Sequence, residues 1–511
     1  MAEEPQPMPP FQRSIVTLVV MGATLIVILD TTIANVALPH MKAALSATQD
    51  SISWVLTSYI VASAIATPIT GWLTDRIGRR QLFTFAIVGF TLSSMLCGVS
   101  VSLGMMVLAR LLQGLFGACI VPLSQAIIYE INPQERHARA MGVWSMGMML
   151  GPLLGPVAGG WLTDTWSWRW CFFINVPIGA VTAAGSWLML PNNLRRRRRF
   201  DRFGFALLAI ALLAMQLVLD RGTDRDWFQS TEIQIEAAVM VAALWMFIVH
   251  VCTARGAIVP AALFRNRTYV SALVLITVIG GLVTAGSALL APMLQGIMGY
   301  PVMTAGILVM PRGVGLIITL QLASRLIGKV DPRILMGAGL VLAAVSLYMM
   351  TDLSPDMGSR VIIVSGFIQG LGMGLVSMPL NLLAFSSVEP PLQTEGASFY
   401  SLMRGLGGSI TISVTSAMLS HNIQQSHADL SAGVDPTVQH VLAMGQIQNI
   451  GQIGGMIPSF LDVMINQQAT FIAYIDDYWA MMWSVIFVLP LVLILRPVKR
   501  RGDMAAIDMG H

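Results

Sequence analysis

The chain has 511 residues, of which 55% are hydrophobic and only 11% are charged, and its formal net charge is +4. Soluble domains carry about 25% charged residues, so this composition excludes a soluble protein and indicates a surface that mostly faces lipid. We expect no metal centre and no nucleic-acid binding, because the four cysteines lack paired spacing and no basic patch is interleaved with aromatic residues.

Apolar runs recur along the chain at the length of about 20 residues that a helix needs to cross a bilayer. We predict an all-α membrane protein with about fourteen spans. Their approximate limits are 15–38, 52–72, 82–100, 104–126, 139–161, 170–190, 204–219, 234–252, 269–294, 302–327, 333–350, 360–383, 397–419 and 477–496.

The distribution of Lys and Arg predicts the orientation of these spans. Both residue types concentrate in alternate loops, such as 76–80 and 195–199, which places both termini in the cytoplasm by the positive-inside rule. No Lys or Arg occurs between Arg404 and Arg496. The polar stretch 420–470 is therefore predicted to be a long periplasmic loop.

Two short motifs repeat at an offset of about 250 residues. Gln113-Gly114-Leu115 and Pro122-Leu123 in the fourth span are echoed by Gln369-Gly370-Leu371 and Pro379-Leu380 in the twelfth. Parallel repeats of this kind are typical of transporters built from two related bundles. The predicted organisation is an N-terminal tail 1–14, a six-helix bundle 15–190, a linker with an inserted two-helix hairpin 191–268, a second six-helix bundle 269–496 and a C-terminal tail 497–511.

The fifth span carries a glycine at every fourth position. The series is Gly147, Gly151, Gly155 and Gly159, with Pro152 and Pro156 between them. On a helix these glycines share a face that a neighbouring helix can approach closely, and each proline removes one hydrogen bond and bends the helix. Such a face is either a static packing seam or an interface that slides.

Several of these motifs together resemble one family. Leu29-Asp30-Thr-Thr-Ile-Ala-Asn35-Val-Ala-Leu-Pro39, Gly71-Trp-Leu-Thr-Asp75-Arg76-Ile-Gly78-Arg79-Arg80, Arg110-Leu-Leu-Gln113-Gly114 and the Gly-Pro repeat of the fifth span occur in the order seen in the EmrB/QacA subfamily of 14-span drug–proton antiporters. The chain is thereby similar to members of the major facilitator superfamily, along nearly its whole length.

The resemblance implies a major facilitator fold and export of drug-like compounds from a bacterial cell across its inner membrane. The proton gradient would drive export, with no bound cofactor. An EmrA-like periplasmic adaptor and an outer-membrane channel are the implied partners. The nearest alternative is an exporter of one metabolite, such as a siderophore or an organic acid. An enzyme is not expected, since no nucleophile–base set or phosphate loop is present.

Charged residues inside a bilayer are costly and therefore indicate function. Asp30 is predicted about 12 Å below the outer face in the first span, and Arg110 about 9 Å below it in the fourth. An opposite charge nearby favours an ionised Asp30, whereas burial opposes it. The two side chains form either a permanent ion pair or the proton-coupling site, the role that the resemblance implies for Arg110.

Further polar residues in the spans are candidates for a substrate cavity. They are Asn35, Gln113, Arg312, Gln369 and Arg404. Arg312 could meet a polar or anionic substrate, or it could bond the carbonyls freed by Pro311. Arg404 could instead snorkel to the membrane surface or form a pair.

The loop after the second span is the candidate conformational gate. It contains Gly71, Asp75, Arg76, Gly78, Arg79 and Arg80. Positive-inside charges alone would explain its arginines but not Asp75 at a fixed place in the motif. The resemblance implies that this loop latches the two halves together.

Overall fold

The computed structural model describes residues 9–133, 136–191, 199–254, 256–327, 329–354, 358–389, 392–432 and 456–495. These residues are almost entirely helical, and 13 helices among them are long and apolar enough to cross a membrane. Thirteen of the predicted spans coincide with these helices. The remaining span, 397–419, lies within a longer helix, Gln393–Ala432, that packs against the other membrane helices.

The first bundle consists of six crossings, several of which are broken into shorter helices. They are α1 (Pro10–Ala44), α3–η1–α4 (Trp54–Ala66, Thr67–Ile69, Thr70–Ile77), α5 (Arg79–Gly98), α6–α7 (Leu103–Gly117, Ile120–Ile131), α8 (His137–Thr165) and α9–α10 (Trp170–Phe173, Asn175–Met189), with the short α2 (Gln49–Ile52) between the first two.

The second bundle repeats this plan with six further crossings. They are α14–η5 (Arg267–Pro292, Met293–Ile297), α15 (Val302–Leu326), α16 (Pro332–Thr351), α17 (Arg360–Ser386), α18 (Gln393–Ala432) and α20–η7 (Met456–Val488, Leu489–Leu493). In both bundles the first crossing packs on the fifth, as α1 on α8 and α14 on α18. The second likewise packs on the fourth, as α3 on α6 and α15 on α17. This shared packing confirms the predicted pseudo-symmetric bundles.

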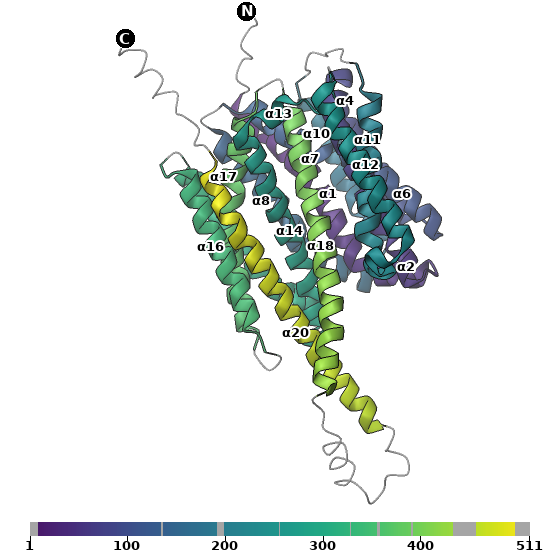
Figure 1. The fold of residues 1–511 in the computed structure, drawn as a ribbon. Helices are drawn as coiled ribbons and strands as arrows, with labels where there is room; N and C mark the ends of the chain where they lie inside the picture. Colours follow the sequence, from purple (N-terminus) through teal and green to yellow (C-terminus); the bar gives the residue numbers. More distant parts are fainter. Residues whose placement is uncertain are drawn as a thin grey trace, which may run out of the picture.

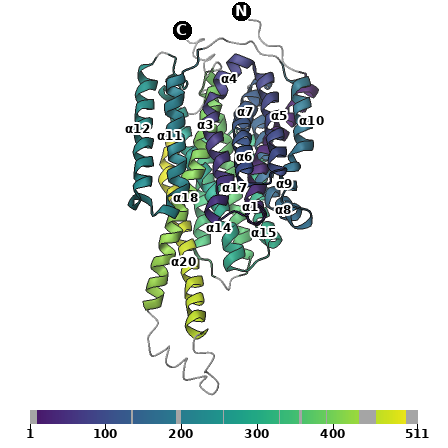
Figure 2. The ribbon, with the colours of Figure 1, turned by 90° about the vertical axis from the view of Figure 1, so that its right-hand side faces the viewer.

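The two predicted hairpin helices are α11 (Arg202–Arg221) and α12 (Thr231–Thr253), joined by the turns η3 (Thr223–Arg225) and η4 (Trp227–Gln229) and followed by α13 (Ala262–Arg265). Figure 2 shows them side by side at the edge of the bundle. Asp201 closes the hairpin at its base, because its carboxylate accepts hydrogen bonds from the Gly204 and Ile258 amides and lies 2.9 Å from His250 Nε2. α11 packs on α3 and also contacts α18, so the hairpin touches both bundles.

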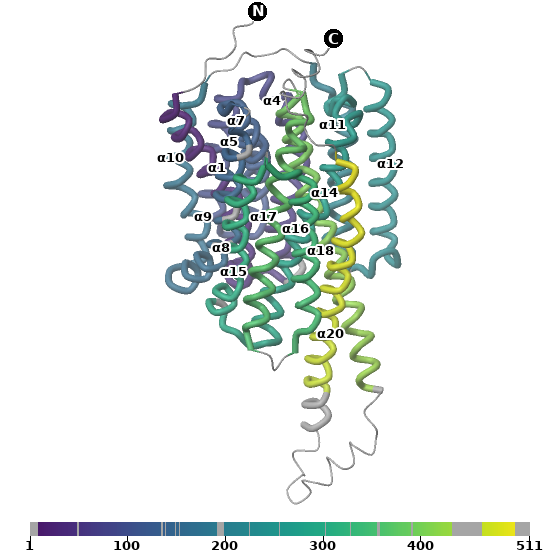
Figure 3. Tube along the Cα trace, turned by 90° about the vertical axis from the view of Figure 1, so that its left-hand side faces the viewer, coloured from purple at the N-terminus to yellow at the C-terminus, as the bar shows by residue number. Residues whose placement is uncertain are grey.

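The bundle has a proximal end, where α1 begins and η7 ends, and a distal end opposite it (Figure 1). α18 and α20 extend well beyond the other helices at the distal end, as Figures 1 and 3 show. His427 Nε2 lies 3.0 Å from Asp462 Oδ1 and joins the two extensions.

This extension differs from the loop predicted at 420–470, since residues 420–432 and 456–470 are helical. The physical reason is that no Gly or Pro occurs between Gly408 and Gly433, or between Pro458 and Pro490. Polar residues such as Gln are good helix formers, so low hydropathy ended the predicted span without ending the helix. Residues 433–455 lie outside the described part of the chain.

Candidate functional site

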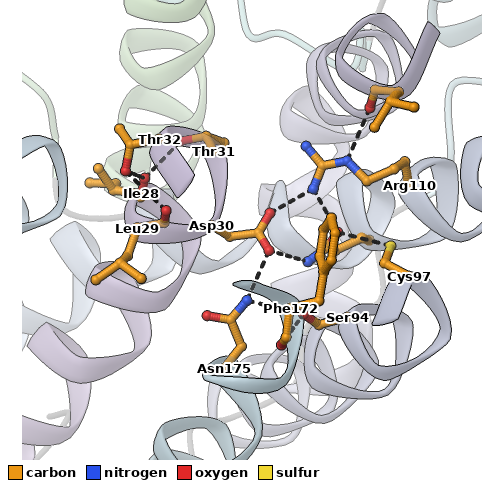
Figure 4. A network of polar contacts seen from close by, with 12 residues as sticks. Ile28, Leu29, Asp30, Thr31, Thr32, Ser94, Cys97, Arg110, Phe172 and Asn175 are labelled. Carbon is orange, nitrogen blue, oxygen red and sulfur yellow. Dashed lines mark hydrogen bonds and ion pairs between the residues drawn. The ribbon is translucent and has the colours of Figure 1, made fainter. Parts of the chain in front are cut away.

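Asp30 on α1 lies at the centre of a buried polar network, shown in Figure 4. Its Oδ2 is 2.6 Å from Arg110 NH1 on α6. Its Oδ1 accepts hydrogen bonds of 2.8 Å from both Gln113 Nε2 and Asn175 Nδ2. The carboxylate therefore has three donors supplied by two other helices. These contacts satisfy both carboxylate oxygens and tie α1 to α6 and α10.

Arg110 also has hydrogen-bond and aromatic partners other than Asp30. Its Nε donates to the Val55 carbonyl at 3.0 Å, and NH1 also donates to Gln113 Oε1 at 2.8 Å. The guanidinium carbon lies 4.4 Å from the centre of the Tyr59 ring, a cation–π distance. Asp30 and Arg110 are each only 1% exposed. In this conformation the pair is sealed from solvent, and both side chains are hydrogen-bonded.

The ion pair connects helices that are far apart in the sequence, α1 and α6. Removing one partner of a buried ion pair leaves the other charge without a counter-charge, which typically costs about 3–5 kcal/mol of stability. A free energy of about this size can shift the equilibrium between two conformations almost completely. A proton on Asp30 has a similar effect, because it removes the negative charge that Arg110 faces. The helices α1, α6 and α10 meet at this one carboxyl.

The glycine face of α8 receives the helix that carries Asp30. A Cβ on Gly147 would lie 2.6 Å from Met21 Cε, and one on Gly151 would lie 2.6 Å from Ile28 Cγ2. Further along, Thr32 packs onto Gly155 and donates to the Gly151 carbonyl at 3.3 Å.

Gly159 lies beneath Ile33, so all four glycines face α1. α8 runs uninterrupted from His137 to Thr165 through Pro152 and Pro156. Any shift of α1 along this smooth face moves Asp30 with it.

Arg312 and Gln369 converge in the second bundle. Gly286 on α14 lies between them, because a Cβ there would be 3.8 Å from Arg312 NH1 and 3.9 Å from Gln369 Nε2. Arg312 donates to Ser287 Oγ at 3.2 Å and to the Val283 carbonyl at 3.4 Å, both on α14. These contacts differ from the predicted alternative of a bond to carbonyls freed by Pro311 on its own helix.

The other predicted cavity residues are placed differently. Gln113 is 0% exposed and belongs to the Asp30 network, so it does not line a cavity in this conformation. Asn35 is exposed on α1. Arg404 is half-buried and lies 3.2 Å from Met148 Sδ on α8, so it contacts the opposite bundle and not Arg312. The structure therefore does not bring the five predicted residues together.

The predicted gate joins the two bundles at the proximal end. Arg79 forms an ion pair with Glu130 on α7 and donates to Thr394 Oγ1 on α18 at 3.3 Å. Asp75 and Glu395 lie within electrostatic range of Arg79. Tyr129 adds a hydrogen bond of 3.4 Å to the Asn381 carbonyl across the same interface. The halves are thus closed against each other at this end.

The remaining gate residues shape the loop. Gly71 makes room for Glu395, because a Cβ there would lie 2.6 Å from Glu395 Cγ. Gly78 has φ +98°, a conformation that favours glycine, and it separates α4 from α5. Arg80 lies over the Trp187 ring at 4.8 Å, whereas Arg76 is exposed.

Asn175 and Glu395 belong to these sites, although neither was a candidate from the sequence. Asn175 stands within the run Trp170-Cys-Phe-Phe-Ile-Asn175-Val-Pro177, and a polar amide in an apolar span was the signal available. Glu395 lies just before the predicted span 397–419, where a charge is unremarkable. Its role depends on its approach to Gly71, which is distant in sequence.

Comparison with known proteins agrees with this architecture. The sequence model described as Major Facilitator Superfamily matches residues 20–412. The Multidrug export protein EmrB of Escherichia coli K12 is 33% identical over 503 residues, which cover 97% of this chain and 98% of that protein. The Fatty acid resistance protein FarB of Neisseria gonorrhoeae is 32% identical over 493 residues, covering 95% and 97%.

Two solved structures share the fold at low sequence identity. The proton:xylose symporter XylE superposes with a TM-score of 0.61 at 14% identity, over 97% of this chain and 99% of that one. The human organic anion transporter MFSD10 gives a TM-score of 0.60 at 14% identity, over 94% and 100%. At this identity the likeness concerns the arrangement of helices.

Proposed function

The chain belongs to the major facilitator superfamily, and from this premise we propose that it is a proton-driven exporter of amphipathic, drug-like compounds in a bacterial inner membrane. Membership makes the protein a multi-pass membrane transporter and not an enzyme. The names of its relatives, a multidrug export protein and a fatty acid resistance protein, support amphipathic compounds as the substrate class.

The observation that carries this proposal is the sealed pair between Asp30 on α1 and Arg110 on α6. α1 is also the helix that packs against the glycine face of α8. In the proposed cycle a proton from the outer side neutralises Asp30 and weakens its hold on Arg110. Arg110 keeps its bonds to the Val55 carbonyl and Gln113, while α1 is released to shift along α8. The bundles then rock, the proximal gate around Arg79 opens, and the substrate enters from the cytoplasm.

Loss of the proton to the cytoplasm reverses these steps. Asp30 regains its charge and pairs again with Arg110, and the gate closes at the proximal end, which is the arrangement described above. The substrate, now exposed to the distal side, leaves outward. Inward proton movement is thereby coupled to export, and alternating access follows from the rocking of two similar bundles.

Arg312 favours a second candidate, an exporter of one anionic metabolite. In the described part of the chain no carboxylate forms an ion pair with Arg312. A cation of this kind beside Gln369 suits the head group of an organic acid. A drug exporter can also use it for polar or anionic compounds, so the substrate range decides between the two.

Purified protein in liposomes with an imposed pH gradient tests the proposal. Several unrelated amphipathic compounds should accumulate against their gradients, and Asp30→Asn should abolish the response to the pH gradient while Asp352→Asn, an acid outside the network, should not. Transport of a single organic acid would favour the second candidate. Transport that is indifferent to the pH gradient would refute proton coupling.

The distal extensions of α18 and α20 are the proposed docking surface for a periplasmic adaptor, which leads to an outer-membrane channel. Because His427 and Asp462 are in contact, deleting 428–461 and joining them through a short glycine linker should preserve the bundle. Transport in liposomes should persist, and co-purification of the adaptor should be lost. Adaptor binding that survives the deletion would place docking elsewhere.

A further inference from the structure

A second buried acid, Asp477 on α20, plays no part in the steps described so far. It is 0% exposed, and neither of its carboxylate oxygens has a hydrogen-bond partner in the part of the chain that the structure describes. Asp30 has the same burial but three donors. Burying an ionised carboxylate without a cation or donors is far more costly than burying the neutral acid, so the two carboxyls are suited to opposite protonation states.

The surroundings of Asp477 connect it to the polar cluster of the second bundle. Among the described residues, its interactions with titratable groups are with Asp476, Tyr474 and Tyr478, all on α20. Within the part of the chain that the structure describes, no such group reaches it from α14, α16, α18, η5 or η7, the elements packed against α20. The charge of Arg312 on α15 reaches the neighbouring Tyr478.

Tyr478 is a second buried polar side chain next to Asp477 in the sequence. Its hydroxyl is buried and also has no hydrogen-bond partner in the described structure. Met481, one turn further along α20, approaches Gly286, where Arg312 and Gln369 also converge. Asp477 therefore lies beside Tyr478, which interacts electrostatically with Arg312 in the cluster that the proposed function assigns to substrate.

We propose that Asp477 is a second proton-binding site of the transporter, an inference that rests on the proposed proton-driven function. In the described conformation its carboxyl is neutral and holds the proton, while Asp30 is ionised and paired with Arg110. When the packing around α20 changes, the O–H bond breaks, the proton passes to water, and the carboxylate that remains is hydrated by that water. Each bundle then contributes one proton-binding carboxyl to the cycle.

A purely architectural role for Asp477 predicts something different. A carboxylate that holds helices together does so through donors on its neighbours, and buried polar atoms in proteins are nearly always partnered. Asp477 lacks such partners among the described residues. A neutral side chain of the same shape should therefore leave the fold intact, and Asp477→Asn supplies one. Asp476→Asn is the matched control, because Asp476 is the adjacent acid but is exposed.

The experiment measures the proton-to-substrate ratio in liposomes, by finding the substrate gradient that exactly balances an imposed pH gradient. Asp477→Asn should still transport, with the ratio lowered by one proton relative to wild type. Asp476→Asn and Asp477→Glu should keep the wild-type ratio. A wild-type ratio in Asp477→Asn overturns the inference. So does loss of folded protein in that variant, since it would reveal an ionised carboxylate that holds the fold together.

The outcome also separates this inference from the function on which it rests. If wild-type protein shows no balance between the two gradients, the proton-driven function itself fails. If wild type and Asp477→Asn balance at the same ratio, the proposed function stands and only the second site is rejected.

Discussion

Neutralising only one member of the Asp30–Arg110 pair should lower the stability of the protein much more than neutralising both members together. At the observed 2.6 Å and an effective dielectric constant of about 20, Coulomb attraction in the pair is about 6 kcal/mol. Much of it offsets the cost of desolvating two ions, and measured losses for one-sided changes to buried pairs are about 3–5 kcal/mol. Asp30→Asn and Arg110→Gln should each destabilise the protein by that amount.

The double variant should be closer to wild type than either single variant. The double variant buries no charge at this site. Its loss of stability therefore comes only from hydrogen bonds that the new amides do not restore, at about 1 kcal/mol each. The free energy of unfolding, measured by SDS titration in mixed micelles, should therefore show a coupling energy of about 3 kcal/mol or more. Single losses that simply add in the double variant would refute a sealed ion pair. The double variant should nevertheless lose proton-driven transport.

Three further predictions address the glycine face, the gate and the hairpin. Gly155→Leu should block transport, measured as drug uptake into inverted vesicles, because even its Cβ would lie 2.7 Å from Thr32 Cβ; unchanged uptake would mean that the face is not tightly packed. Gly78→Ala should lower stability by about 1–3 kcal/mol in SDS titration, because φ is +98° there, whereas an unaltered midpoint would argue against that conformation. Burial alone would raise the pKa of Asp201, but the hydrogen bonds to its carboxylate outweigh burial and lower the pKa. The stability that Asp201 contributes is therefore present at neutral pH and is lost as the pH falls through this lowered pKa. Hydrogen exchange in the hairpin should accordingly rise in acid in wild type but depend less on pH in Asp201→Asn; equal pH dependence would contradict the assignment.

The sequence predicted the parts of the site that follow from the cost of charge in lipid. Asp30 and Arg110 stood out because few charges occur in apolar spans, and their estimated depths agreed. The glycine series predicted a smooth helix face, which the packing of α1 on Gly151 and Gly155 confirms. The partner of that face could not be predicted, because spacing along one helix does not identify the helix that packs on it.

Other features depended on contacts between distant segments. Gln113 resembled a cavity residue through its echo at Gln369, but its amide faces Asp30, 83 positions earlier in the chain. Asp477 coincided with the predicted start of the last span, where an acid is expected in water. The helix in fact begins at Met456, so the same residue lies inside α20 and is buried. Hydropathy marks where lipid contact ends, and a helix can continue beyond that point.

The most direct test of the account is the number of protons that purified protein releases when substrate is added in weakly buffered detergent solution. Proton release should accompany substrate addition in wild type, because in the proposed cycle substrate enters the protonated form and Asp30 then loses its proton. Asp30→Asn should bind substrate with correspondingly less release across the pH range where wild type responds. Equal release from the two proteins would contradict the claim that Asp30 couples proton movement to transport.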